Sequence, residues 1–177
     1  MRESVRMVIV LTVIAMVSAG VLSQVYNVAS VIIAENQARE MESTVYEVFS
    51  SADSVQFVEA DFVMFNAKDE ADNVLGFAFA GEASGYAGPV RVMVGVDADS
   101  KQIVDVAVLN HTETPGLGSR IESEEFRSQF RGKTVESPLR ISQDIDNITG
   151  ATLSAEAVAQ AVRNNFSEAL SAFEGRQ

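Results

Sequence analysis

The chain begins with a long apolar stretch. No charged residue occurs between Arg6 and Glu35, and residues 7–23 read MVIVLTVIAMVSAGVLS. About 20 apolar residues cross the roughly 30 Å hydrocarbon core of a bilayer, so we expect one transmembrane helix over residues 7–31. A cleaved signal peptide is the alternative, because Ser18-Ala19-Gly20 offers small residues for a peptidase. The stretch exceeds the roughly 7–15 apolar residues of a signal peptide, which favours the anchor.

The next stretch has the spacing of an amphipathic helix. Between Ala34 and about Phe49, apolar residues recur every three or four positions, at Ala38, Met41, Val45 and Val48. This spacing places them on one face of a helix. We therefore expect the membrane helix to continue outward, either as a stalk or as the first helix of a domain.

Four segments rich in Val, Ile and Phe predict β-strands. They run from Val55 to Phe65, Val74 to Ala80, Val90 to Val96 and Ile103 to Leu109. The polar stretches AKDEADN and DADSKQ separate the members of two pairs, as turns separate hairpin strands. Strands in direct succession favour an antiparallel sheet.

Two helices are predicted after the strands. Ser123 is a candidate N-cap of a short helix that contains Phe126 and Phe130. A longer helix is expected from about Ser154 to Phe173, with apolar residues at i+4 spacing: Val158, Val162, Phe166 and Leu170. Strands first and helices at the ends indicate an α+β fold. The predicted organisation is a tail at 1–6, a transmembrane helix at 7–31 and one domain at 32–177.

Charge is distributed unevenly along the chain. Of the total of −12, residues 1–34 carry +1, which leaves −13 for the rest. An acidic surface repels phosphate backbones, so nucleic acid is not an expected partner. Arg2 and Arg6 precede the apolar stretch, and the positive-inside rule therefore predicts a cytoplasmic amino end. The domain would then be periplasmic or otherwise extracytoplasmic, held at the cell (inner) membrane by one span.

The composition restricts the possible chemistry. The chain has no Cys and one His, which excludes thiolate-held iron-sulfur clusters, disulfides and His-rich zinc sites. No metal site is expected. Redox chemistry in this chain would therefore depend on an organic cofactor.

The segment DIDNITGATLS, residues 144–154, directly precedes the last predicted helix. Unpaired N–H groups and the helix dipole favour an anion at such a position. Gly150 and Ala151 add little bulk, and Thr152 offers a hydroxyl at the helix entrance. The segment is a candidate phosphate site, and the alternative is that Thr152 only caps the helix.

Residues 146–152, Asp-Asn-Ile-Thr-Gly-Ala-Thr, resemble the flavinylation motif of the FMN-binding domain family, Asp-x-x-(Ser/Thr)-Gly-Ala-Thr. All fixed positions match: Asp146, Thr149, Gly150, Ala151 and Thr152. In that family a separate flavin transferase joins FMN through a phosphoester to the last Thr. The resemblance therefore implies covalent FMN on Thr152.

Two more segments resemble the same family. Residues 85–89, Gly-Tyr-Ala-Gly-Pro, are similar to its Gly-Tyr-x-Gly-Pro turn, and residues 113–118 are similar to its Glu-Thr-Pro-Gly-Leu-Gly loop. The resemblance implies further cofactor contacts at Ser154, Glu113, Thr114, Gly116, Leu117 and Gly118, with Tyr86 and His111 as weaker candidates.

Each of these loop residues has a structural alternative. Pro115-Gly116 is a common turn dipeptide, so the loop can be a simple tight turn after a strand. His111 can be a hydrogen-bonded structural group rather than a proton donor to the flavin. Tyr86 can be a packing residue rather than a stacking partner of the flavin ring.

With its single span and small domain, the chain resembles the G subunits of Rnf complexes, the ion-translocating ferredoxin:NAD oxidoreductases. This implies an electron-transfer protein without substrate turnover of its own, whose partners are other redox and membrane subunits, a flavin transferase and the bilayer. The C subunits of sodium-pumping NADH:quinone reductases are the alternative. A non-redox membrane adaptor or ligand-binding domain, in which Thr152 is only a cap, and a flavin-binding sensor are further alternatives.

Overall fold

The computed structural model describes residues 2–58 and 62–175; Met1, residues 59–61 and residues 176–177 lie outside the description. The chain divides into two compact units, with the boundary between Glu40 and Met41. Helix α1 (Arg2–Val48) forms the first unit and contributes its last turns to the second. With a mean hydropathy of 2.4 in its most apolar part, it is long and apolar enough to cross a membrane. Residues 7–31, where a transmembrane helix is expected, lie within this longer helix.

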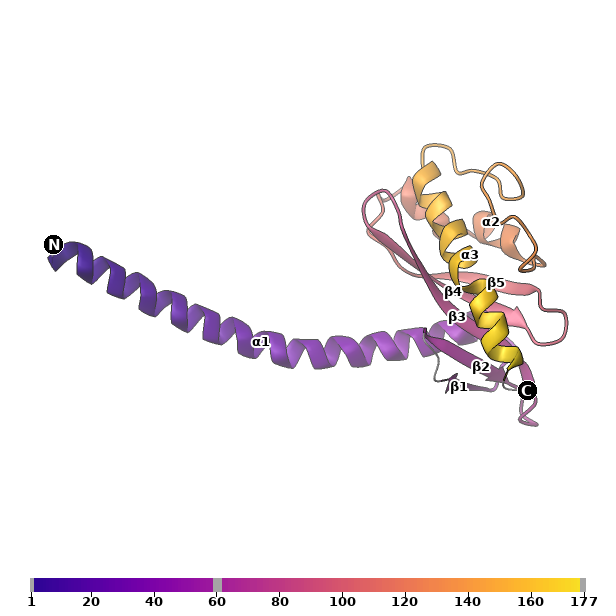
Figure 1. The fold of residues 1–177 in the computed structure, drawn as a ribbon, viewed down its shortest axis with the longest axis horizontal. Helices are drawn as coiled ribbons and strands as arrows, with labels where there is room; N and C mark the ends of the chain where they lie inside the picture. Colours follow the sequence, from indigo (N-terminus) through magenta and orange to yellow (C-terminus); the bar gives the residue numbers. More distant parts are fainter. Residues whose placement is uncertain (1, 59–61, 176–177) are drawn as a thin grey trace. The chain divides into compact units, whose positions relative to one another are not determined.

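Five antiparallel strands follow, in the spatial order β1-β2-β3-β4-β5 (Figure 1). They are β1 (Ser54–Val58), β2 (Met64–Lys68), β3 (Val74–Ser84), β4 (Pro89–Asp97) and β5 (Ile103–Asn110). The prediction of one strand from Val55 to Phe65 is wrong, because this run folds back on itself and places Phe57 opposite Phe65. Charged residues, which are depleted in strands, occur between the two halves of the run at Glu59 and Asp61. The other three predicted strands are confirmed.

Helix α3 (Thr152–Glu174) covers one face of the sheet. Phe166 and Phe173 stack on Phe79 and Phe77, with ring centroids 5.8 and 4.6 Å apart. The helix backbone approaches β3 so closely that a Cβ on Gly81 would lie 2.2 Å from the carbonyl oxygen of Ala161. The predicted apolar stripe is confirmed, because Val158, Val162 and Phe166 are buried and Leu170 packs against the core.

The end of α1 covers the opposite face of the sheet. Val45, Val48 and Phe49 are buried there against Ala78 and Met93. The helical spacing noted between Ala34 and Phe49 is therefore a core-facing stripe in its last part. A sheet covered by one helix on each face confirms the predicted α+β fold.

The connection between β5 and α3 contains three short helical turns: η1 (Gly118–Glu122), α2 (Glu124–Arg127) and η2 (Ser128–Phe130). The predicted short helix is confirmed, with Phe126 and Phe130 in edge-to-face contact at 5.6 Å. Ser123 occupies its N-cap position but makes no side-chain capping bond.

Candidate functional site

Two loops and the start of a helix meet at one end of the sheet. Strands β3 and β5 run in the same direction because alternate strands of an antiparallel sheet do so. The turn after β3 (residues 85–88) and the loop after β5 (residues 111–117) therefore leave the sheet at the same edge. The amino end of α3 joins them there, since side chains from all three line one cavity.

The cavity has a volume of about 550 Å³, within the range of roughly 300–1,000 Å³ found for ligand pockets. Its lining consists of Tyr86, Glu113, Thr114, Leu117, Gly118, Gly150, Ala151, Thr152, Leu153 and Ser154. The three segments that resemble the FMN-binding motifs, far apart in the sequence, thus line one cavity.

Thr152 is the first residue of α3, and its side chain is exposed. Its Oγ1 accepts a hydrogen bond of 2.8 Å from Nδ2 of Asn147. The N-cap is Ala151, and no side-chain hydrogen bond among the described residues caps the helix. The interpretation of Thr152 as a helix cap is therefore wrong.

The first turn of α3 has the properties of an anion site. The first N–H groups of a helix have no acceptor within the helix, and here no side-chain bond among the described residues caps them. The positive end of the helix dipole also lies at the cavity. Gly150 has a φ of +81°, a left-handed conformation that glycine adopts without strain. The chain therefore turns into the helix without a side chain at position 150.

Glu113 and Ser154 are buried at the base of the site, with exposed fractions of 4% and 2%. Oε2 of Glu113 accepts a hydrogen bond of 2.6 Å from the Ser154 hydroxyl, and Oε1 accepts one of 3.1 Å from the N–H of Ala87. One carboxylate thus contacts all three segments of the site, since it belongs to one of them and binds the other two.

The loop after β5 is a tight turn and also a wall of the cavity. The carbonyl oxygen of Thr114 accepts hydrogen bonds from the N–H groups of Leu117 and Ser119, each 3.2 Å long. Gly116 has a φ of +77° and donates its N–H to Oγ of Ser119 at 2.9 Å. The turn interpretation is therefore confirmed, and it places Thr114 and Leu117 at the cavity.

Both ring nitrogens of His111 take part in hydrogen bonds. Nδ1 accepts the N–H of Glu113 at 3.1 Å and so carries no proton, while Nε2 lies 2.9 Å from Oε1 of Glu122 and donates to it. His111 lies outside the lining of the cavity. This geometry agrees with the interpretation of His111 as a hydrogen-bonded structural group.

The predicted site residues fall into two groups. His111, Gly116, Asp146 and Thr149 belong to the same loops but lie outside the lining, and the others line the cavity. Tyr86 is 72% exposed, so the interpretation of this residue as a packing plug is wrong.

The motifs alone did not indicate two residues of the site. Leu153 lines the cavity with an exposed side chain, and Asn147 binds the Thr152 hydroxyl. The sequence could have indicated Leu153, because it is an apolar residue that lies outside the buried stripe of its helix. Asn147 occupies a variable position of the motif, so no signal identified it.

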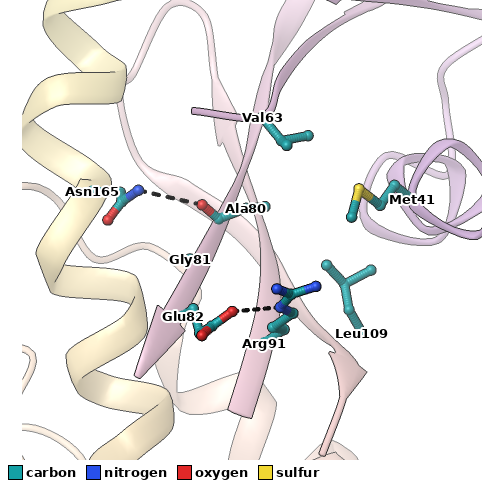
Figure 2. A pocket seen from close by; sticks show the side chains of 8 residues that line it. All are labelled: Met41, Val63, Ala80, Gly81, Glu82, Arg91, Leu109 and Asn165. Carbon is teal, nitrogen blue, oxygen red and sulfur yellow. Dashed lines mark hydrogen bonds and ion pairs between the residues drawn. The ribbon is translucent and has the colours of Figure 1, made fainter. Parts of the chain in front are cut away.

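A second cavity, of about 270 Å³, lies over β3 and β4 near the end of α1 (Figure 2). Met41, Val63 and Leu109 contribute apolar side chains, and the charged groups of Arg91 and Glu82 pair with each other. Among the described residues that line it, none carries a hydroxyl, thiol or imidazole group. Among the described residues, no group of three or more acidic or His side chains could hold a metal ion.

Residues 85–167 match the FMN-binding domain family. The chain is similar to the G subunit of the proton-translocating ferredoxin:NAD(+) oxidoreductase complex of Clostridium ljungdahlii, with 28% identity over 86% of this chain and 84% of the relative. It is also 27% identical to the G subunit of the ion-translocating oxidoreductase complex of Methanosarcina acetivorans, over 92% of this chain and 93% of the relative.

Two crystal structures share the fold. NqrC of Shewanella oneidensis matches with a TM-score of 0.55 and 19% identity, over 73% of this chain and 72% of that chain. The C subunit of the Na(+)-translocating NADH-quinone reductase of Parabacteroides distasonis matches with a TM-score of 0.59 and 18% identity, over 78% and 94%. Residues 85–167 are therefore similar to the FMN-binding domain family, in a chain that is similar over most of its length to G subunits of ion-translocating oxidoreductase complexes.

Proposed function

We propose that this chain carries FMN, joined by a phosphoester to Thr152, and passes electrons within an ion-translocating ferredoxin:NAD oxidoreductase complex of the Rnf type. The observation that carries the proposal is the exposed Thr152 hydroxyl, located at an uncapped helix start and in the cavity that the three motifs share. The G-subunit relatives support the assignment to a redox complex.

The residues of the cavity fit FMN. The first N–H groups of α3 can hold the phosphate, and the exposed apolar side chains of Tyr86, Leu117 and Leu153 can hold the flat ring. FMN accepts and donates electrons when bound, and the protein supplies its position and electrostatic surroundings. A phosphoester leaves the ring free for electron exchange and prevents loss of the cofactor by dissociation.

The attachment reaction needs an activated donor, because FMN itself does not condense with an alcohol in water. We assign the reaction to a flavin transferase that uses a flavin dinucleotide. The bond from Oγ1 of Thr152 to phosphorus forms and the pyrophosphate P–O bond breaks, so a nucleoside monophosphate leaves with the electron pair. Since Oγ1 already accepts a hydrogen bond from Asn147, the hydroxyl proton points elsewhere and can pass to a base of the transferase.

Helix α1 would anchor the domain in the membrane as a single span over residues 7–31, with the domain at 32–177 on the extracytoplasmic side. The apolar composition of the helix supports the anchor, and Arg2 and Arg6 support the orientation. Other redox and membrane subunits of the complex would then exchange electrons with the flavin at that surface.

A C-type protein of a sodium-pumping quinone reductase is the second candidate, because the two crystal structures described above are of C subunits. Co-purification distinguishes the two. A tagged chain should isolate the other proteins of a ferredoxin:NAD oxidoreductase, and isolation of quinone reductase proteins would favour the C type.

Fluorescence on a denaturing gel tests the flavin itself. Protein produced with a flavin transferase should give a yellow fluorescent band, since a covalent flavin survives denaturation. Protein produced without the transferase should give a dark band of equal staining. A dark band in both samples would contradict the proposal.

A further inference from the structure

The Glu113 carboxylate is buried, and its hydrogen bonds among the described residues come from a backbone N–H and a hydroxyl rather than from a cation. Its two oxygens accept hydrogen bonds from different parts of the chain, the N–H of Ala87 and the hydroxyl of Ser154. Burying a charge is costly unless hydrogen bonds compensate it, and bonds to an ionised group are stronger than neutral ones. The two hydrogen bonds of the carboxylate therefore stabilise this arrangement of the three segments.

Two glycines make room for this side chain. A Cβ on Gly85 would lie 2.3 Å from Oε1 of Glu113, and a Cβ on Gly118 would lie 2.7 Å from its Oε2. Both distances are far below van der Waals contact, so any larger residue would displace the carboxylate. The glycines at these two motif positions are thus explained by Glu113 without reference to a ligand.

The main chain of Glu113 is held as well. Its N–H donates to Nδ1 of His111, and the same ring is bound on its other side to Glu122. With both carboxylate oxygens bonded, the side chain cannot form these contacts and also turn toward a ligand.

We infer that Glu113 is a positioning residue, whose carboxylate ties the first turn of α3 to the 85–88 turn and so holds the Thr152 hydroxyl toward the cavity. Ser154 lies two residues after Thr152, and Ala87 directly follows Tyr86. The clamp, formed by Glu113, Ser154 and the Ala87 N–H, therefore couples the acceptor to the opposite wall. The inference rests on the proposed attachment of FMN to Thr152.

Initial rates of FMN transfer to the purified protein, measured with a flavin transferase and a flavin dinucleotide, test the clamp. A displacement of about 1 Å can cost about 100-fold in rate, so we expect Glu113→Ala to lower the rate by roughly 10- to 100-fold. Glu113→Gln can accept the N–H of Ala87 with its carbonyl oxygen and donate its amide N–H to Oγ of Ser154, so it should restore most of the rate. Glu136→Ala, an exposed glutamate outside the site, is the matched control and should leave the rate unchanged.

A second variant tests the clamp in case Glu113→Ala does not fold. Ser154→Ala leaves the helix intact but removes one bond of the clamp, and it should raise amide hydrogen exchange at Ala87 in flavin-free protein. Exchange at Ala87 equal to that of the wild type, or wild-type transfer rates in folded Glu113→Ala, would overturn the clamp. If the wild type accepts no FMN, the proposed function is wrong. The exchange experiment would still show whether Glu113 holds the two segments together, because it uses flavin-free protein.

Discussion

At the scale of single residues, the most informative side chain is a hydroxyl that its own helix does not use. Thr152 lies where threonine often caps a helix, yet its Oγ1 binds only Asn147 among the hydrogen bonds of the described residues. A group that is exposed, oriented and free of a structural task is suited to modification. This distinguishes Thr152 from Ser154, whose hydroxyl is buried against Glu113.

The hydrogen bond from Asn147 should affect the rate of modification. Asn147→Ala removes the donor that orients Oγ1, and one hydrogen bond of about 0.5–1.5 kcal/mol corresponds to a rate loss of roughly 2- to 10-fold. Initial rates of FMN transfer measure the effect. Asn164→Ala, an exposed asparagine further along α3, should transfer at the wild-type rate. Equal rates for both variants would show that Asn147 does not orient the acceptor.

Asp144 should stabilise the segment that leads to the motif. Its carboxylate accepts the N–H groups of Leu139 and Arg140 and pairs with Lys133 at 3.3 Å. Burial raises its pKa, but the bonds from Arg140, Leu139 and Lys133 outweigh burial and lower the pKa below its ordinary value. Asp144→Asn should therefore reduce the free energy of unfolding near neutral pH by about 1–2 kcal/mol.

The sign of the pH dependence follows from the lowered pKa. A carboxyl group with a lower pKa in the folded than in the unfolded state stabilises the fold above the unfolded pKa, which is about 3.9. This contribution is lost as the pH falls through the folded pKa. Urea unfolding should show the full difference between wild type and Asp144→Asn at pH 7 and a smaller one below about pH 4. A difference that grows on acidification would contradict the assignment.

At the scale of elements, the contact between α3 and β3 fixes where the helix begins relative to the sheet. A Cβ on Gly81 would meet the carbonyl oxygen of Ala161 at 2.2 Å, so helix and strand could not keep their present separation. In this packing, the start of α3 and the two loops share one cavity.

Gly81→Val should accordingly destabilise the domain. Overpacking a closely packed contact costs about 1–3 kcal/mol, measurable as a lower midpoint in urea unfolding. Gly20→Val, at a glycine with no neighbouring atoms in reach, serves as the control and should leave the unfolding of the domain unchanged. A midpoint for Gly81→Val equal to that of the wild type would contradict the close approach.

The elements also differ in how well sequence patterns predict them. The stripe of α3 and the strands from Val74 onward follow directly from spacing, because each buries one face. In the run from Val55 to Phe65, Glu59 and Asp61 mark a division, but the pairing of the two halves with each other depends on contacts between strands, which the pattern does not give. The role of Glu113 could not be predicted either, because it depends on contacts between residues 26 and 41 positions apart.

At the scale of the whole molecule, an apolar helix is joined to an acidic domain. Residues 1–34 carry a net charge of +1 and the rest carry −13. Arg2 and Arg6 should stay in the cytoplasm, which places the proposed flavin at the outer face of the membrane. There it would be separated from soluble cytoplasmic electron donors and would relay electrons among membrane partners.

This topology predicts the outcome of protease accessibility. Protease added to intact spheroplasts should digest the domain and spare the anchor, and a reporter that is active only outside the cytoplasm should work when fused after Gln177. A domain that is protected, together with an active cytoplasmic reporter, would reverse the orientation. The proposed relay at the outer face would then have to be abandoned.

The attachment of FMN to Thr152 is tested most directly by intact mass measurement. Wild-type protein produced beside a flavin transferase should gain the mass of one FMN less water, and Thr152→Ala should gain nothing while remaining folded. Thr149→Ala keeps the acceptor and should be modified only in part. If Thr152→Ala still carries the added mass, the acceptor is another residue and the proposed role of Thr152 is wrong.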